Sequence, residues 1–456
     1  MSNRSEILKR RLFDSIGRPW QDILPESKIE AILKAEDIRY RKRLYTPIVT
    51  VWAMIHQALS ADKSLSHTLK WVRKWLVVDS EAEAPSSDTG AYSKARSRLP
   101  EIVLERLVPE TGKELDNMIA PEQLWCGRVV KVFDGSTILM SDTPDNQQEY
   151  PQHGNQQKGC GFGMARIVVF FSLLTGVVRL GCIASKHTSE TEMSRSLYKE
   201  LEAKDVAMAD QLHGNYVDLA LIKQQGADGM IRKHHARKTD FRTGKKNGIG
   251  DHKLEWKKPN RRPKHMTQEE FDTLPETLQV REVSLRLTRK GWRDKCIIVV
   301  TTLLDADIYS AQALSELYGC RWYAAEVSLR HLKTTLKMEM LTAKTPAMVR
   351  KEFWAHLLGY NLIRTIMEQS APQADYQRAR LSFQTTRQGL MAILSELGSD
   401  DQSVRTRVYT DLLDETATTL VPYRPNRYEP RVVKRRPKPF PRMKQPRAVL
   451  KAKLAA

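Results

Sequence analysis

The sequence has few cysteines, no long apolar run and no nucleotide-binding loop. Its longest apolar stretch, Ile167–Val178, contains Ser172, Thr175 and Gly176 and falls short of the roughly 20 residues that a membrane-spanning helix needs. The first residues, MSNRSEILKRRLFD, carry charges where a secretory signal peptide requires an apolar core. We therefore expect a cytoplasmic protein that does not enter the membrane.

The five cysteines exclude a disulfide framework, because their number is odd and no two are spaced as C-x2-C. The same spacing argues against a zinc site. The pattern G-x4-G-K-[ST] is also missing from the sequence, so no nucleotide-driven step is implied.

Acidic residues are scarce relative to basic ones. The chain of 456 residues has 74 Lys and Arg against 54 Asp and Glu, a formal net charge of +20. Such an excess opposes compaction by self-repulsion, so it usually serves a polyanionic partner. Nucleic acid is the commonest such partner, and an anionic membrane surface is the alternative.

The first part of the chain, to about residue 120, has the pattern of several short helices. Thr46–Leu59 is largely apolar and suits a buried helix, whereas Leu65–Leu76 is amphipathic with basic residues around its polar side. Short helices with basic faces suit a DNA-binding domain of the helix-turn-helix type. A charged face that meets only solvent is the alternative.

From about residue 125 the pattern changes to strands and helices. Short apolar runs predict strands at 129–133, 165–174, 177–184, 205–209 and 229–232. Two predicted helices, 189–203 and 216–225, lie between the last three of these strands. The order β-β-β-α-β-α-β fits an α/β fold with a mixed sheet flanked by helices.

Residues 236–312 differ in composition from what precedes them. They begin with a basic, turn-rich stretch and continue with two predicted strands, Val280–Thr288 and Asp294–Leu303, joined at Gly291. We interpret this segment as a β-rich insertion.

The last third of the chain is predicted to be mainly helical. Long helices are expected over Ser310–Leu341 and Ala347–Glu368, and residues 371–430 are expected to be helical in part. The tail from Arg431 has ten Lys or Arg, four prolines and no acid. We expect this tail to be extended or disordered and available for contact with phosphates.

Three acidic residues stand out by their position in these elements. Asp134 is expected to end the first strand, Asp210 to end the fourth, and Glu326 to lie on the long helix. Carboxylates that converge in this way can hold two divalent metal ions, which stabilise the attacking and leaving oxygens in phosphodiester chemistry. Without cations such a cluster is costly, so it seldom serves structure alone.

Each acid has a simpler interpretation when it is taken alone. An Asp after a strand is an ordinary turn or helix-cap residue, and Glu326 could pair with Arg330 at i+4. Trp322, close to the glutamate, could stack on a flipped base or pack in the core. The metal site is predicted from the three acids together, in this order of elements, in a basic chain.

The motifs around these acids resemble the DDE transposases of bacterial insertion sequences, in the branch with a Y-R-E-K signature and a β-rich insertion. The matching residues are VFDGSTILMSDTPDNQQEYPQ around Asp134, MAD at Asp210, and Tyr318, Arg321, Glu326 and Lys333. The segment LKTTLKMEMLTAKTPAMVRKEFWAHLLGYNLIRTIM and the tail EPRVVKRRPKPFP are also similar to this branch. The resemblance covers nearly the whole chain.

The resemblance implies a ribonuclease H-like catalytic core and a mechanism. Asp134, Asp210 and Glu326 would bind two Mg²⁺ or Mn²⁺ ions, and a homodimer would cut double-stranded DNA at the transposon ends, through a hairpin, and join it to target DNA. Tyr318, Arg321 and Lys333 would contact DNA near the scissile phosphate. The DNA-binding residues expected from this region are Tyr318, Arg321, Trp322, Arg330 and Lys333.

With this resemblance the chain divides into six expected segments. They are a helical N-terminal DNA-binding domain over 1–122, the first part of the catalytic core over 123–235, the β-rich insertion over 236–312, the second part of the core with the glutamate helix over 313–370, a helical C-terminal region over 371–430, and the basic tail over 431–456.

The sequence departs from the branch at two places. The signature is Y-x2-R-x3-E-x6-K, but four residues separate Arg321 from Glu326. One extra residue rotates Arg321 by about 100° around a helix relative to the glutamate, unless a π-bulge absorbs it. Gln211 also stands after Asp210 where the branch has Arg.

These departures keep one rival open: a decayed or host-adopted protein that binds DNA without cutting it. A metal-dependent nuclease of the same fold that hydrolyses DNA without strand transfer is a second. A membrane-surface protein recruited by its basic tail is a third.

Overall fold

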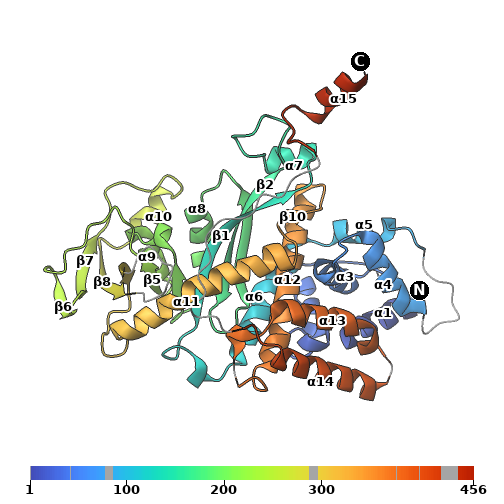
Figure 1. The fold of residues 1–456 in the computed structure, drawn as a ribbon, viewed down its shortest axis with the longest axis horizontal. Coiled ribbons are helices and arrows are strands. Elements are labelled where there is room, and N and C mark those ends of the chain that lie inside the picture. The colour runs from blue at the N-terminus through green and yellow to red at the C-terminus, as the bar shows by residue number, and fades with distance from the viewer. Residues whose placement is uncertain are drawn as a thin grey trace. The chain divides into compact units, whose positions relative to one another are not determined.

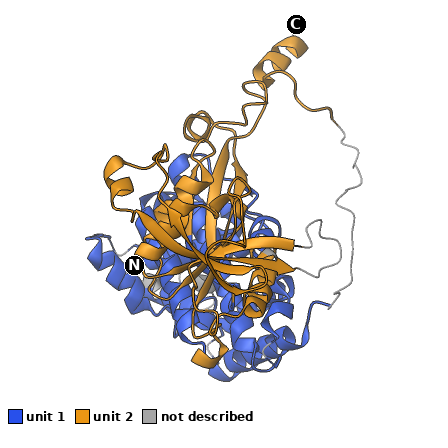
Figure 2. Ribbon diagram, turned by 90° about the vertical axis from the view of Figure 1, so that its left-hand side faces the viewer, with its two compact units in different colours: residues 1–120, 174–180, 328–422 blue, residues 121–173, 181–327, 423–456 orange. Residues whose placement is uncertain are grey.

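A computed structural model describes residues 2–41, 43–77, 86–286, 296–375, 377–399, 401–422 and 440–455. These residues form two compact units, coloured separately in Figure 2. Unit 1 comprises Met1–Ala120, Leu174–Leu180 and Ser328–Pro422. Unit 2 comprises Pro121–Leu173, Gly181–Val327 and Tyr423–Ala456. Both units therefore draw on segments that are far apart in the sequence.

Unit 1 is built around α12, a helix of 25 residues, most of which are buried. Pro346 starts this helix, where its missing N–H is not needed. The helix packs against α3, α6, α13 and α14. The helices of this unit are α1 (Ser2–Asp14), α2 (Glu26–Ala35), α3 (Pro47–Leu59), α4 (Leu65–Val77), α5 (Gly90–Arg98), α6 (Glu101–Asn117), α12 (Pro346–Ser370), α13 (Phe383–Leu397) and α14 (Gln402–Thr418).

The helices predicted at Thr46–Leu59 and Leu65–Leu76 are confirmed within one residue as α3 and α4. Helix α3 is buried along its whole length, as its apolar sequence indicated. Leu99 and Pro100 separate α5 from α6, because the residue before a proline avoids helical geometry. Whether these helices bind DNA stays a prediction.

Two histidines, His56 and His356, are buried in unit 1 and neutral in the folded state. Burial lowers the pKa of each imidazole to about 3, far below the roughly 6.5 of an unfolded chain. The unfolded chain therefore binds protons at these sites below about pH 6.5, and the folded chain does not until about pH 3. Stability is fully present above pH 6.5 and is lost progressively as the pH falls through that window.

We expect the free energy of unfolding to decrease between pH 6.5 and 5, above the range where most carboxylates titrate. His331 is a third ring whose pKa burial lowers to about 3, whereas Asp134, with a pKa of about 6, releases a proton when the chain unfolds. Urea unfolding at a series of pH values should therefore show a net uptake of up to about two protons. The variant His356→Asn should remove about one of them. A free energy of unfolding that stays flat over this interval would contradict the neutral, buried state of both rings.

Unit 2 contains a mixed sheet with the order β3-β2-β1-β4-β5-β9-β8-β7-β6, and Figure 1 shows its strands running beside the long helix α11. Strand β1 pairs antiparallel with β2 and parallel with β4, and β4 pairs parallel with β5. This is the ribonuclease H-like arrangement that the resemblance implied. The strands are β1 (Val130–Met140), β2 (Met164–Ser172), β3 (Val178–Ser185), β4 (Val206–Ala209), β5 (Asp228–Arg232), β6 (Lys245–Gly248), β7 (Asp251–Lys257), β8 (Thr277–Arg286) and β9 (Cys296–Thr301).

Helices cover this sheet. Helix α11 (Ala311–Arg330) contributes Leu314, Leu317, Tyr318 and Ala325 to a core that it shares with β1, β4 and β5. Helix α8 (Glu190–Tyr198) packs against β2, and helix α9 (Tyr216–Gln224) packs against β5. The other helices of the unit are α7 (Pro144–Glu149), α10 (Gln268–Asp272) and α15 (Arg447–Ala455).

The prediction that Asp134 ends the first strand is wrong. Strand β1 continues to Met140, because Asp134 pairs with Val169 and the pairing with β2 runs on to Leu139. Pairing with β4, in contrast, stops at Val132. Asp134 therefore lies within a strand, but at the point where that strand leaves its parallel neighbour.

The segment predicted as a β-rich insertion extends the core sheet. Strand β9 pairs with β5 of the core, and β8, β7 and β6 follow in order. The sequence predicted β8 and β9 but not β6 and β7, since β6 is fully exposed and polar. Gly291, the predicted turn residue, lies outside the described residues.

The end of the chain differs in part from its expected extended form. Residues 423–439 lie outside the described part, but α15 is helical after Pro446, where alanine, leucine and lysine replace the prolines. None of the helices in the described ranges is both long and apolar enough to cross a membrane.

Candidate active site

Asp134 and Asp210 lie side by side on one face of the sheet. The parallel pairing of β1 and β4 aligns Val132 with Met208, and each aspartate comes two residues later on its own strand. Side chains alternate along a strand, so both aspartates project to the same face as these two residues. Val132 and Met208 pack in the core with α11, so the acids point toward this helix.

Asp134 is held in an environment that favours its neutral form. Burial raises the pKa of its carboxyl to about 6, although the Arg321 guanidinium and a hydrogen bond from the Gly135 N–H both oppose the rise. The nearby carboxylates of Glu190 and Asp210 raise this pKa further. A bound cation would supply the positive charge that the ionised form needs.

Asp210 follows β4 directly, as predicted, and starts a short 3-10 turn, Gln211–His213. Its Oδ1 accepts a hydrogen bond of 2.8 Å from the Leu212 N–H. This cap uses one oxygen of the carboxylate and fixes its direction.

Tyr318 is buried, with 4% of its surface exposed. Its hydroxyl donates a hydrogen bond of 3.2 Å to the carbonyl of Ala209, the residue before Asp210. In this conformation Tyr318 therefore supports the strand end that carries the aspartate. Its predicted contact with DNA stays a prediction, and it would require this side chain to move.

Arg321 lies one helical turn after Tyr318 and over its ring, with 5.5 Å between the guanidinium carbon and the ring centroid. Its positive charge acts on Asp134. The Nε of Arg321 is buried and has no hydrogen-bond partner within the described residues. A guanidinium that keeps its Nε donor free beside the Asp134 carboxylate suits a phosphate bound next to that carboxylate.

Glu326, by contrast, is exposed on α11, whereas the preceding residue Ala325 is fully buried in the core. Tyr318, Arg321 and Ala325 occupy positions i, i+3 and i+7, which share one face of a helix. Glu326 is rotated by about 100° from that face. The extra residue before Glu326 thus has a visible consequence: an alanine stands where the signature spacing would place the glutamate.

The extra residue is not absorbed between Arg321 and Glu326, because α11 is α-helical from Ala311 to Arg330. A π-helical turn follows instead, at His331–Thr335, where the Leu336 N–H donates to the His331 carbonyl at 2.9 Å. A π-turn holds about one residue more than an α-turn. The bulge that could realign the glutamate therefore exists in this helix, but it comes after Glu326.

Three further residues were predicted to contact DNA. Arg330 ends α11 and is exposed, and Lys333 is half-buried within the π-turn. The side chain of Trp322 lies outside the described part of the chain. DNA contact by these three residues stays a prediction.

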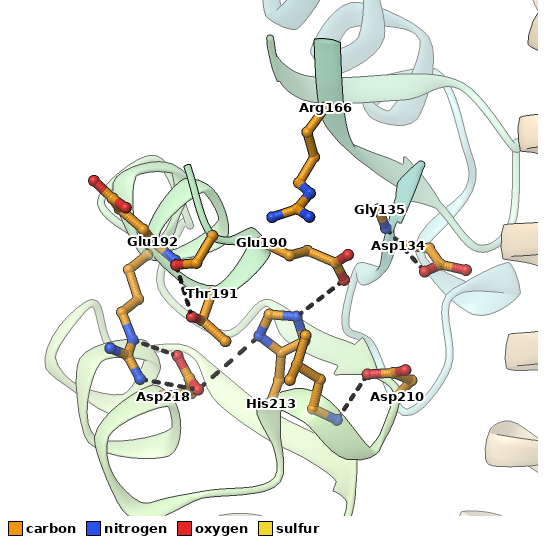
Figure 3. A network of polar contacts seen from close by, with 12 residues as sticks. Asp134, Gly135, Arg166, Glu190, Thr191, Glu192, Asp210, His213 and Asp218 are labelled. Carbon is orange, nitrogen blue, oxygen red and sulfur yellow. Dashed lines mark hydrogen bonds and ion pairs between the residues drawn. The ribbon is translucent and has the colours of Figure 1, made fainter. Parts of the chain in front are cut away.

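Glu190 is an acidic residue near the site that the sequence did not single out. It is the first residue of α8, and its carboxylate lies against the backbone of Gly135, where a Cβ atom would collide with it. Figure 3 shows its side chain reaching toward Asp134 and His213. The glycine inside the strand motif VFDGST was the only hint in the motif, because a glycine within a strand often marks a place where another group approaches the backbone closely.

The donors in this region fit a hard divalent cation, since they are carboxylate oxygens. Within the described ranges, however, no three Asp, Glu, His or Cys side chains stand close enough to share one ion. Asp134, Asp210 and Glu326 would therefore have to move toward one another to bind metal together. Repulsion between like charges opposes that approach until a cation offsets it.

A cavity of about 330 Å³ in unit 1 is a second feature with functional chemistry. Arg39, Arg41, Arg43 and Arg98 line it together with Tyr40 and Tyr45, and its lining includes no acid within the described part of the chain. The sequence had pointed to the basic face of α4 but not to this cavity. Arg39 also lies 3.4 Å from the exposed carboxylate of Asp37, which is not part of the lining. Several exposed arginines that line one cavity suit phosphate groups.

The family model described as "Transposase DDE domain" matches residues 125–362, more than half of the chain. The chain belongs to the DDE transposase family. It is also similar to transposase InsG for insertion sequence element IS4 of Escherichia coli (strain K12), with 26% identity over 443 residues that cover 94% of this chain and 95% of the relative. A piggyBac transposase synaptic complex with hairpin DNA matches 90% of this chain and 86% of its own, with 10% identity and a TM-score of 0.42.

This DDE transposase is thus an enzyme that cuts and joins DNA. Its chemistry depends on divalent metal ions, as in the family generally. The matched residues 125–362 include Asp134, Asp210, Arg321 and Glu326.

Proposed function

We propose that this transposase binds the inverted-repeat ends of an insertion sequence, cleaves them and transfers their 3′ ends into target DNA. Asp134, Asp210 and Glu326 are the metal ligands in this proposal, and each site holds two Mg²⁺ or Mn²⁺ ions. The observation that carries it is the pair Asp134 and Asp210 on one sheet face, beside the unpaired guanidinium Nε of Arg321. A hairpin intermediate opens the second strand.

The residues of the chain divide the work in this proposal. The ions stabilise charge on the attacking and leaving oxygens when they are bound. Asp134 and Asp210 hold them, and Asp210 is kept in direction by its cap on the Leu212 N–H. Arg321 binds the scissile phosphate opposite the metal ions. Tyr318 fixes the end of β4, next to Asp210, through its hydrogen bond to the Ala209 carbonyl. Two copies of the chain act as a homodimer, each at one end of the element.

The test is strand cleavage by the purified chain. A labelled duplex that carries the inverted repeat bordering the gene should be nicked in Mg²⁺ or Mn²⁺, with a free 3′ hydroxyl at the cut. Addition of target DNA should then give joined products. No nicking in either metal would rule out the proposal, and nicking without joining would favour a nuclease instead.

A second function, binding of DNA ends without cleavage, is favoured by one observation: Glu326 is exposed and Ala325 takes the buried position. Stable binding of the repeat with no nicking in either metal would support it. The same assay therefore separates the two functions.

The arginine cavity of unit 1 is expected to bind DNA phosphates. Replacement of Arg39, Arg41 and Arg98 by alanine should weaken DNA binding and flatten its salt dependence. The slope of log K against log salt should fall in magnitude by about 0.9 for each phosphate that the variant no longer neutralises. Affinities measured between about 50 and 200 mM salt would show this change.

A control outside the cavity is Arg407→Ala, which replaces an exposed arginine on α14. It removes one charge elsewhere in unit 1 and should change the slope by much less. An unchanged slope in the triple variant would exclude the cavity as a phosphate-binding surface.

A further inference from the structure

Glu190 stands beside Asp134, although the two residues come from different elements. Asp134 projects to the α11 face of β1, and Gly135, the next residue, faces the side on which α8 packs. The Glu190 carboxylate occupies the space that a side chain at 135 would fill. Glycine at this position thus opens a path from α8 to the aspartate.

A stabilising role at the start of α8 does not explain where the Glu190 side chain lies. An acid in the first turn of a helix is stabilised by the helix N-terminus, which would account equally for Glu190 and Glu192. Glu192 pairs with His265 at 3.2 Å, away from the aspartates. Glu190 instead lies where its charge acts on Asp134. Two carboxylates side by side repel each other, and a cation held by both would offset that cost.

His213 provides an independent observation. This ring is 1% exposed, and its Nε2 lies 3.7 Å from Oε1 of Glu190 but has no hydrogen-bond partner within the described residues. On the other side its Nδ1 meets the Tyr198 hydroxyl at 3.2 Å. The ring packs edge-on against Phe133, 4.8 Å between centroids. A buried polar atom therefore points at Glu190 with hydrogen-bonding capacity in reserve.

His213 also links Glu190 to the second aspartate. It ends the 3-10 turn that Asp210 caps, so Asp210 and His213 move as parts of one short turn. Oδ2 of Asp218 lies 4.0 Å from Nδ1 of His213. The Asp218 carboxylate forms an ion pair with Arg195 at 2.8 Å. Figure 3 shows this row of groups, with Glu190 between His213 and Asp134.

We propose that Glu190 is a further carboxylate ligand of the divalent-cation site at Asp134, and that His213 is a positioning residue that holds it there. The proposal rests on the proposed function, because it takes Asp134 and Asp210 as metal ligands. It adds an acid from the first helix after the antiparallel strands to the three that the signature motifs supply. Metal-ligating side chains are commonly held by a second polar group in this way.

The test is Mn²⁺ binding to the full chain without DNA. Binding is measured by calorimetry and by the electron paramagnetic resonance signal of free Mn²⁺. Glu190→Gln keeps the size of the side chain and removes its charge, and it should weaken Mn²⁺ binding by about tenfold to a hundredfold. Glu192→Gln, the same change in the same helical turn, should bind as wild type does.

His213→Gln should weaken Mn²⁺ binding by less than Glu190→Gln. Combined with Glu190→Gln it should add little, since a positioning residue loses its effect once the group that it positions is gone. Additive losses would mean that His213 acts independently of Glu190. Thermal unfolding of each variant identifies any loss of binding that comes from a loss of structure.

Parallel titrations of Asp134→Asn and Asp210→Asn separate this proposal from the one on which it rests. Wild-type binding by Glu190→Gln, together with weak binding by the two aspartate variants, would overturn the role of Glu190 alone. Wild-type binding by all three variants would overturn the metal site itself.

Discussion

Asparagine in place of Asp134 or Asp210 is expected to slow strand cleavage by about a thousandfold or more, with DNA binding retained. Metal ions that stabilise the reacting oxygens contribute several kcal/mol to the transition state, and each 1.36 kcal/mol corresponds to about tenfold in rate. Asparagine keeps the shape of the side chain but cannot supply the charge that a hard cation requires. Single-turnover cleavage of a labelled end and its binding by gel shift would measure both effects.

The matched control for these variants is Asp145→Asn. Asp145 is exposed in the first turn of α7, in the stretch that follows Asp134. Its replacement removes one negative charge nearby and should leave the cleavage rate within a few-fold of wild type. Cleavage that survives at the wild-type rate in Asp134→Asn would remove this residue from the site.

Deletion of one alanine from the pair Ala324–Ala325 is expected to raise the cleavage rate by about a hundredfold. The deletion brings the glutamate back by about 100° onto the buried face that Arg321 occupies. Misplacement of a catalytic group by about 1 Å can cost a hundredfold in rate, and the rotation moves Glu326 further than that. The π-turn at His331–Thr335 can relax to α-helical geometry and so keep the register of the residues that follow.

The matched control inserts a third alanine after Ala325. This change has the same size and the opposite sense, so it should rotate the glutamate further away and lower the rate. Equal rates for the deletion variant and the wild type would show that the chain already realigns Glu326 on DNA, for example by moving the bulge before it. A lower rate in a stably folded deletion variant would contradict the assigned role of Glu326.

The sequence predicted those parts of the fold that bury apolar residues. The run Val206–Ala209 is buried throughout and is followed by Asp210, so the sequence alone indicated where this strand ends. Helix α3 was predicted for the same reason. Burial on all sides leaves a continuous apolar signal in the sequence, and such segments are the most readily predicted.

The sequence-based predictions are wrong or incomplete where strand pairing, or a contact between residues far apart in the chain, determines the structure. The first strand was predicted to end at Asp134, yet Gly135, Ser136 and Thr137 continue β1 because β2 pairs with them. Strand β6 is exposed and polar, and β7 mixes charged residues with buried ones, so neither gave a clear strand signal. Glu190 lies 56 positions after Asp134 by their residue numbers, so only the folded chain shows that the two meet.

The extra residue before Glu326 let the sequence predict part of the geometry of this helix, but not all of it. The spacing correctly indicated that the glutamate would be out of register with Arg321, since Ala325 is the buried residue. The sequence also suggested a π-bulge, but it could not say on which side of the glutamate the bulge would form. The packing of the residues before and after the bulge decides that position.

Metal ligation by Asp134 is the central claim, and a change of metal preference tests it most directly. Cysteine at this position replaces a hard oxygen with a soft thiolate, which accepts Mn²⁺ or Zn²⁺ more readily than Mg²⁺. Asp134→Cys should fail to cleave DNA ends in Mg²⁺ and regain cleavage in Mn²⁺ or Zn²⁺, whereas Asp134→Ala should stay inactive in all three. Cleavage by Asp134→Cys in Mg²⁺ at the wild-type rate, or equal rescue of Asp134→Ala by the softer ions, would contradict the account.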